Sequence, residues 1–181
     1  MPTDVSRKII RAILEFGTRV ARSRAHAREL NERGGLGYRN VIVDAGQLRY
    51  AQNISVGPHF LQADEPVEVG GNDAGSNPYE LLMAALGSCA SITVRMYSER
   101  KEWPLQGVHV DLSWARVHAE DCAECDTEVR MVDGIEMEIS FLGDLSEDQR
   151  KRLFEIANKC PVHRTLSSQV QIHARLANAS L

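Results

Sequence analysis

Two cysteines in apolar surroundings are the residues of this sequence best suited to chemistry. Cys89 lies in the run GSCAS, and Cys160 lies much later, in the run KCPVHRTL. A thiolate can attack the O–O bond of a peroxide, and the sulfenic acid that forms condenses with a second nearby thiol to give a disulfide. A buried cysteine in isolation is more often a small apolar residue of the core. The spacing of the two residues leaves both interpretations open.

Cys89 falls within residues 77–100, the stretch around which the chain is organised. Asn77 is predicted to cap a helix, with Glu80 three residues later in the capping-box position and a proline at the first helical position. From Tyr79 to Tyr97 almost every residue is apolar or small, on all sides of the predicted helix. A helix that is apolar all round is expected to be buried.

Cys160 is predicted to end a second helix, which begins at Ser146 with Gln149 in the capping-box position. The inner face of that helix is expected to carry Leu153, Phe154, Ile156 and Ala157. Pro161 then starts a short helix that runs through His163 and Arg164. At the N-terminus of that helix, backbone amides and the helix dipole would favour Cys160 as a thiolate.

The remaining segments supply the elements that must hold these two helices. A helix is predicted over residues 4–33, because its apolar residues recur at helical spacing. β-Branched runs, alternation and a turn at Gly57-Pro58 predict strands. These strands are expected near residues 41–43, 50–56, 59–62, 108–114, 135–141 and 170–176. The order of elements predicts an α+β fold, with an N-terminal helical extension at 1–37 and one domain at 38–181.

Length, composition and charge limit the partners and the location of the protein. The 181 residues are 43% hydrophobic, enough for one compact core. The net charge is −4, with eight basic and four acidic residues in 1–33 (+4) and thirteen and twenty-one in the rest (−8). Nucleic acid is therefore not an expected partner, and the basic segment is best explained as a solvated helix face.

The sequence also lacks an uninterrupted apolar run of membrane-spanning length and a secretory signal, so a cytoplasmic protein without a membrane partner is expected. Cysteines in that compartment are thiols, redox centres or metal ligands rather than permanent disulfides.

A second group of candidate residues is His118, Cys122 and Cys125, in the run HAEDCAEC. A single CxxC supplies two of the four ligands that a structural zinc site needs. The residues that could complete such a site are Cys160, His163 and His173. A redox-active dithiol is an alternative, and it could act as an auxiliary reductant of the main cysteine pair. A loop without chemistry is the third interpretation.

Taken in order, these motifs resemble the OsmC/Ohr family of osmotically induced and organic hydroperoxide resistance proteins. The resemblance rests on GSCAS in a long apolar helix and on CPV before the end of the chain, and it covers about residues 48–177. It is closest to the branch that carries NPYELL, RMYSERKEWPL, HAEDC and CPVHRTL.

The resemblance implies an OsmC-like fold in an intertwined homodimer, with curved antiparallel sheets packed around two long central helices and active sites at the dimer interface. It implies reduction of organic hydroperoxides to alcohols without haem, metal or another cofactor. Cys89 would then be the peroxidatic cysteine and Cys160 the resolving cysteine. A dithiol, such as a lipoyl group, or a small thiol would reduce the disulfide.

Two departures from the family pattern concern the activation of Cys89. The best-known members place a catalytic Glu at the position of Tyr79, and one helical step separates Glu80 from it by about 100°. The capping box is the better explanation of Glu80. Those members also use an Arg from an early β-turn, and the equivalent turn here, SVGPHF, has none. The candidates for a supporting role are Glu80, Arg39, Arg49, His59, His163 and Arg164.

The sequence therefore predicts a thiol peroxidase that uses Cys89 and Cys160. The missing Glu/Arg pair favours the alternative, an OsmC-like protein that binds or senses a small hydrophobic ligand. A zinc-dependent structural protein built on the CxxC loop is the third hypothesis.

Overall fold

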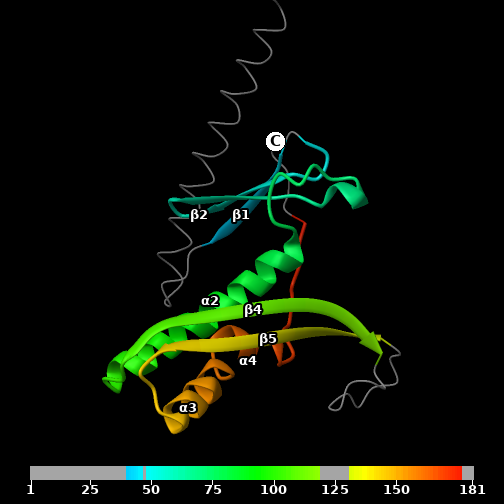
Figure 1. The fold of residues 1–181 in the computed structure, drawn as a ribbon. Helices are drawn as coiled ribbons and strands as arrows, with labels where there is room; N and C mark the ends of the chain where they lie inside the picture. The colour runs from blue at the N-terminus through cyan, green and yellow to red at the C-terminus, as the bar shows by residue number, and fades with distance from the viewer. Residues whose placement is uncertain (1–39, 47, 119–130, 177–181) are drawn as a thin grey trace, which may run out of the picture. The chain divides into compact units, whose positions relative to one another are not determined.

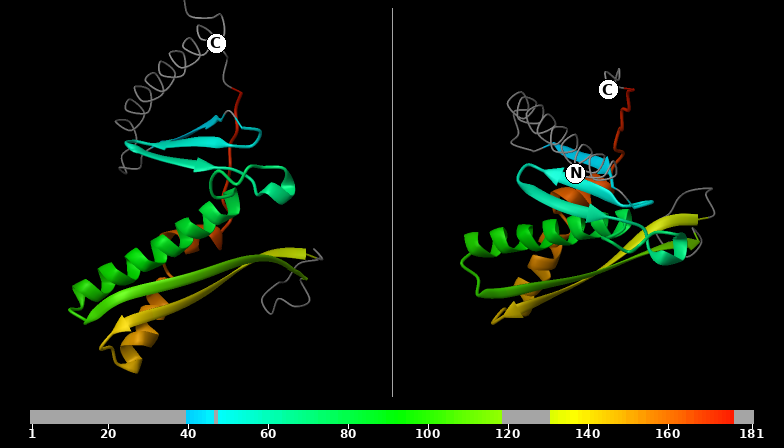
Figure 2. Two further views of the ribbon diagram at one scale, coloured as in Figure 1. Left: turned by 45° about the horizontal axis from the view of Figure 1, so that its top comes forward. Right: turned by 90° about the horizontal axis from the view of Figure 1, so that it is seen from above.

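The computed structural model describes residues 40–46, 48–118 and 131–176. The chain divides into two compact units, residues 1–78 and 79–181. Figure 1 shows the elements of both units, and Figure 2 gives two further views. The helix predicted over residues 4–33 lies outside the described residues, and the predicted boundary near residue 37 stays a prediction.

The first unit is built on a three-stranded antiparallel sheet in the order β1-β2-β3. Its strands are β1 (Val41–Ala45), β2 (Gln52–Val56) and β3 (His59–Ala63). The predicted turn at Gly57-Pro58 is confirmed, and it joins β2 to β3 with Val56 opposite His59. Gly57 has φ +59°, which glycine adopts without steric cost.

A buried carboxylate organises the loop that precedes the long helix. Asp64 is only 2% exposed, and its side chain accepts hydrogen bonds from the backbone N–H groups of Glu65 (2.9 Å), Asn72 (3.0 Å) and Ala74 (3.3 Å). The loop also contains the short 3-10 helix η1 (Val67–Val69). These bonds satisfy the buried side chain and order the loop.

The second unit begins with α2 (Pro78–Arg100), which starts at the predicted proline. Only one stripe of α2 is buried in the chain, and it consists of Leu86, Gly87, Ala90, Val94 and Ser98. On another side of the helix, Ile92 is 59% exposed and Met96 is 66% exposed. The single chain therefore buries one stripe of α2, and burial of the other faces, expected for a helix between the sheets of a dimer, stays a prediction.

The long hairpin of β4 (Leu105–His118) and β5 (Met131–Gly143) forms the second sheet. The predicted alternation is confirmed, since Val108, Leu112, Ile135 and Phe141 pack against the core. α2 runs along this hairpin in Figures 1 and 2. The approach is close at Gly87, where an added Cβ would lie 2.7 Å from Leu112 Cδ1.

Two helices follow the hairpin, α3 (Glu147–Ala157) and α4 (Pro161–Leu166). The predicted capping box at Ser146 is confirmed, with reciprocal hydrogen bonds to Gln149 of 3.2 and 2.9 Å. On α3, Leu153 and Ala157 are buried, whereas Phe154 is 48% exposed. The prediction that Phe154 faces the core is therefore wrong, because Leu153 and Ala157 lie four residues apart on the one stripe that α3 buries.

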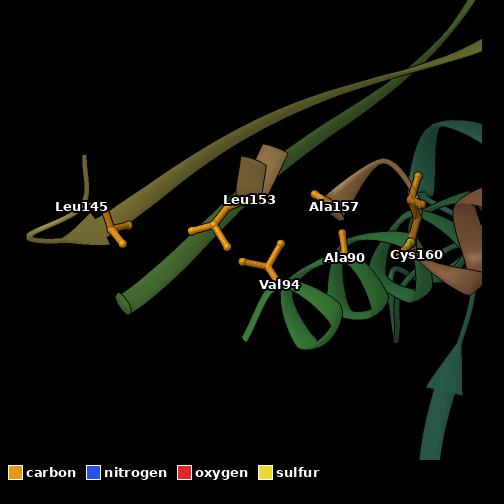
Figure 3. Packing of buried hydrophobic residues seen from close by; sticks show 7 residues of the cluster. Ala90, Val94, Leu145, Leu153, Ala157 and Cys160 are labelled. Atoms are coloured by element: carbon orange, nitrogen blue, oxygen red, sulfur yellow. The ribbon is translucent and has the colours of Figure 1, made fainter. Parts of the chain in front are cut away.

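One core joins α2, α3 and the hairpin. Its buried members are Leu86, Ala90, Val94, Leu145, Leu153, Ala157 and Cys160. Figure 3 shows Val94 and Ala90 of α2 near Leu153 and Ala157, with Cys160 at one end of the row. Cys160 thus lies in the same apolar cluster that holds the long helix in place.

The strand predicted over residues 170–176 is absent from the described part of the chain. The segment has no regular secondary structure, and Ile172 and Leu176 are 88% and 97% exposed. Alternation marks the two faces of a strand, but a strand also needs a neighbour for its backbone N–H and C=O groups. Neither described sheet includes this segment.

α2 is also long and apolar enough to cross a membrane, judged by length and composition alone. It is the single helix of that kind among the described residues, and 28% of its most apolar window is buried in the chain. A core helix of a water-soluble protein meets the same criterion, so length and composition alone do not identify α2 as a transmembrane helix.

Replacement of Leu153 tests the joint core. Leu153→Ala is expected to lower the free energy of unfolding by about 2–5 kcal/mol, because the side chain is fully buried between α2 and α3. The matched control is Phe154→Ala, on the next and half-exposed position, which should cost less than half as much. Denaturant unfolding measures both, and equal losses would contradict this description of the core.

Candidate active site

Cys89 lies in the middle of α2, on the edge of its buried stripe. Its side chain is half-buried and packs against the core cluster. The residue after it on the buried stripe, Ala90, is fully covered. The Thr93 hydroxyl donates a hydrogen bond of 2.7 Å to the Cys89 carbonyl, one turn further along the helix. The helix therefore holds Cys89 rigidly while leaving part of the thiol reachable.

Cys160 lies at the junction of α3 and α4, and it is fully buried. It is the N-cap residue of α4, with Pro161 as the first helical residue, as predicted. The backbone N–H of His163 donates to Cys160 Sγ at 3.4 Å. The end of one helix and the start of the next therefore fix the position of this thiol.

The two thiols are free and lie side by side in the core. Burial raises the pKa of the Cys160 thiol, and the backbone N–H of His163 lowers it. A hydrogen bond with Cys89 and the charge of Cys89 raise the Cys160 pKa further. These effects favour the protonated form of Cys160, and its S–H is placed to donate to Cys89.

The expectation that the helix N-terminus favours a Cys160 thiolate is wrong in its net effect. The amide contribution is present, since the His163 N–H contacts the sulfur. Burial outweighs it, because a thiolate loses far more hydration in an apolar core than one long N–H···S contact returns.

A cavity of about 360 Å³ lies beside the Cys160 segment, within the second unit. Its lining comes from α2, β5, α3, α4 and the residues next to them: Leu86, Asp133, Ile135, Met137, Asn158, His163, Leu166 and Ser167. Half of these side chains are apolar and half are polar. The sequence singled out His163 of this set, and the others come together only in the fold.

Glu80 is in the first turn of α2 and is exposed. It precedes Cys89 by nine residues, which corresponds to about two and a half turns of helix, so the two side chains leave opposite sides of α2. Glu80 of the same chain is therefore not placed to activate Cys89.

Tyr79 occupies the position at which the family pattern has its Glu. Its ring stacks on that of Trp114 in β4, with centroids 4.4 Å apart and an interplanar angle of 27°. This contact ties the first turn of α2 to the hairpin. It explains why an aromatic residue suits this position, and sequence reasoning missed the partnership because the two residues are far apart in the chain.

The other predicted supporting residues belong to different parts of the chain. Arg49 is exposed in the first unit and stacks over the Tyr50 ring at 4.8 Å, and His59 is exposed on β3. Arg164 is exposed on α4, and Arg39 lies outside the described residues. Among the candidates that the structure describes, His163 lines the cavity.

The CxxC motif falls where the structure gives no description. His118 is the last residue of β4, opposite Met131, and Cys122 and Cys125 lie outside the described residues. Among the described residues there is no group of three His, Cys, Asp or Glu side chains that could hold a metal ion. The zinc, redox and inert interpretations of the motif all stay predictions.

Comparison with known families identifies the chain. The family model for OsmC-like protein matches residues 70–175, which is more than half of the sequence. The chain belongs to the OsmC-like family. The match spans α2, both cysteines and the hairpin, and it confirms the resemblance that the motifs indicated.

Solved structures of OsmC-like proteins share the fold at low sequence identity. An OsmC-like protein from Mycoplasma pneumoniae matches with a TM-score of 0.57 and 16% identity, over 74% of this chain and 89% of the other. An organic hydroperoxide resistance protein OsmC from Legionella pneumophila matches with a TM-score of 0.52 and 19% identity, over 70% and 88%. An organic hydroperoxide resistance protein from Elizabethkingia anophelis matches with a TM-score of 0.52 and 15% identity, over 70% of this chain and 85% of the other.

These matches establish a mixed fold of helices and antiparallel sheets for this OsmC-like chain. A search of curated proteins found no match.

Because the Cys160 pKa is raised, the free energy of unfolding is expected to depend on pH. The Cys160 thiol has a higher pKa in the folded than in the unfolded state, so its protonated form stabilises the fold. This stabilisation is complete below the unfolded pKa of about 8.5. It is lost as the pH rises through the folded pKa. Between pH 8 and 10 the wild type should therefore lose more stability than Cys160→Ala. Denaturant unfolding across this range measures it, and parallel curves for the two proteins would contradict the assignment.

Proposed function

We propose that this OsmC-like protein is a thiol peroxidase that reduces organic hydroperoxides to alcohols. The observation that carries the proposal is the pairing of two free thiols with different environments. Cys89 is partly exposed, and Cys160 is buried and keeps its proton. A peroxidase of this kind needs a reachable attacking thiolate and a protected resolving thiol.

The reaction follows from these two environments. The Cys89 thiolate attacks the distal peroxide oxygen, an S–O bond forms, the O–O bond breaks, and the alkoxide takes up a proton and leaves as the alcohol. Cys160 then attacks the sulfenic acid sulfur, so that water leaves and a Cys89–Cys160 disulfide forms. A dithiol returns the pair to the reduced state. These steps require no metal or organic cofactor.

Cys160 also takes part in activating Cys89. The Glu and Arg of the family pattern are not found at their positions here. The buried Cys160 S–H instead donates a hydrogen bond to the Cys89 sulfur. A hydrogen bond to an anion stabilises it, although a thiol is a weaker donor than an arginine. We therefore expect a slower peroxidase than one that has the Glu/Arg pair.

The functional unit is proposed to be a homodimer. In the described structure, α2 leaves Leu82, Ile92 and Met96 exposed, which is uncommon for a helix so rich in apolar residues. The exposed segment 170–176 adds Val170, Ile172 and Leu176. A second copy of the chain would cover these side chains, and the same apolar contact would favour alkyl peroxides over hydrogen peroxide at Cys89.

The peroxidase proposal is tested with one equivalent of cumene hydroperoxide. Mass spectrometry is expected to show a Cys89–Cys160 disulfide in the wild type. Cys89→Ser should abolish peroxide consumption in the presence of dithiothreitol, because it removes the nucleophile. Cys160→Ser should instead give Cys89 sulfenic and sulfinic acids, because the resolving thiol is missing.

The control for this experiment is the double variant Cys122→Ser/Cys125→Ser, which should still form the disulfide. Unchanged peroxide with a stable, reduced Cys89 in the wild type would overturn the proposal. That result would support the alternative, a module that binds or senses a small hydrophobic ligand.

The proposed dimer is tested by introducing charged side chains on the exposed face of α2. Ile92→Glu/Met96→Glu is expected to convert a dimer to a monomer, because it would bury two charges in the contact. Sedimentation equilibrium measures the mass. Lys101→Glu, at the exposed residue that follows α2, is the matched control and should leave the dimer intact. If the wild type sediments as a monomer at micromolar concentration, the exposed face of α2 is not a dimer contact.

A further inference from the structure

The C-terminal part of α2 carries a phenol that is surrounded by positive charge. Tyr97 is half-buried, and its hydroxyl oxygen accepts a hydrogen bond of 3.3 Å from Nε of Arg152 in α3. The guanidinium carbons of Arg100 and Arg152 lie 5.5 and 5.8 Å from the centre of the Tyr97 ring. Lys101 adds a third cation, whose charge also acts on the phenol. The peroxidase reaction proposed above leaves this group unused.

Two further side chains hold the phenol and one guanidinium in place. The indole of Trp103 meets the Tyr97 ring edge-on, with ring centroids 5.6 Å apart and an interplanar angle of 75°. Glu155, three residues further along α3, accepts a hydrogen bond from Nη1 of Arg152. Both partners of the hydrogen bond between α2 and α3 are therefore supported from a second side.

The surrounding cations favour the ionised form of the phenol. The hydrogen bond from Arg152 has the largest effect and lowers the pKa of Tyr97. Partial burial raises this pKa, and the charges of Arg152, Lys101 and Arg100 lower it again. The carboxylate of Glu155 is paired with the Arg152 guanidinium. A phenolate is the nucleophilic form of tyrosine, so groups that stabilise it make attack on an electrophile easier.

We propose that Tyr97 is a nucleophilic tyrosine that becomes acylated by acyl phosphates. This chemistry is independent of the proposed peroxidase function, because it uses neither cysteine. The cations define the class of donor, since arginine and lysine bind phosphate groups through charge-assisted hydrogen bonds. Arg100 and Lys101 are exposed, so the phosphate group of the donor has access to them from solvent.

Atoms balance in this step, and nothing is oxidised or reduced. The Tyr97 phenolate oxygen attacks the carbonyl carbon of the acyl phosphate, and a new C–O bond forms. The bond between that carbon and the phosphate oxygen then breaks, and phosphate leaves with the electron pair. The proton that the phenol loses ends on the departing phosphate. The product is an O-acyltyrosine, and Arg100 and Lys101 stabilise the leaving group.

Acetyl phosphate provides the test on the wild-type protein, with the modified residues mapped by mass spectrometry of peptides. Acetylation of Tyr97 is expected to be about tenfold faster than that of Tyr79, because the cations stabilise the Tyr97 phenolate. Tyr79 is 44% exposed, so exposure alone does not predict this order. Hydroxylamine should remove the label from Tyr97, since it cleaves an aryl ester but not the amide of an acetylated Lys101. Equal rates at the two tyrosines, or acetylation of lysines alone, would overturn the inference.

Replacement of Arg152 separates nucleophilic activation from a purely structural contact between α2 and α3. Arg152→Met is expected to slow acetylation of Tyr97 about tenfold at neutral pH, because it removes the hydrogen bond and a charge. The pH dependence of the rate should also move to higher pH, since the Tyr97 pKa rises without Arg152. Lys151→Met, on the neighbouring exposed residue of α3, is the matched control and should change neither. Identical pH profiles for the two variants would contradict the activating role of Arg152.

The class of donor is tested by comparing acetyl phosphate with the neutral donor p-nitrophenyl acetate. Arg100→Gln/Lys101→Gln is expected to slow acetylation of Tyr97 by acetyl phosphate more than acetylation by the neutral ester, because it removes the cations assigned to the phosphate. Equal slowing with both donors would exclude a phosphate-binding role. Tyr97→Phe should lose the hydroxylamine-sensitive label at residue 97 and still form the Cys89–Cys160 disulfide, so a failure of the peroxidase proposal would be seen separately. Circular dichroism checks the fold of every variant.

Discussion

The structure depends on the burial of one thiol, Cys160, against the long helix α2. The same apolar cluster that packs Ala90 and Val94 against α3 also encloses this sulfur. Burial raises the Cys160 pKa and keeps the proton on it, while Cys89 on the edge of the stripe stays partly exposed. The packing that stabilises the second unit therefore also assigns different chemistry to two identical side chains.

The position of Cys160 is determined by helix ends. α3 ends at Asn158 as its C-cap, Pro161 starts α4, and the sulfur between them accepts the His163 N–H. Hydrogen bonds from Arg150 to the carbonyls of Phe141 (2.6 Å) and Gly143 (3.0 Å) fasten α3 to the end of the hairpin. A thiol fixed by backbone on both sides loses little entropy when it forms a disulfide, which suits the resolving role proposed for Cys160.

The residues at the start of α2 differ from the family pattern. Tyr79 stands at the Glu position and stacks on Trp114, so this position ties the helix to the hairpin instead of supplying a carboxylate. Glu80 leaves the opposite side of α2 from Cys89. The apolar face that the single chain leaves open is consistent with a site that a second copy completes.

Local signals in the sequence were enough to determine most elements. Prolines predicted the starts of α2 and α4, the capping box at Ser146 predicted the start of α3, and β-branched runs and alternation predicted strands of both sheets, because these signals act within a few residues. The two cysteines were also identified from the sequence, mainly through the order of the motifs. Only the tertiary structure decided that Phe154 faces outward and that residues 170–176 form no strand. It also decided that Cys160 keeps its proton and that Asp133 and His163 share a cavity. Burial and pairing depend on residues distant in the chain, which no local pattern encodes.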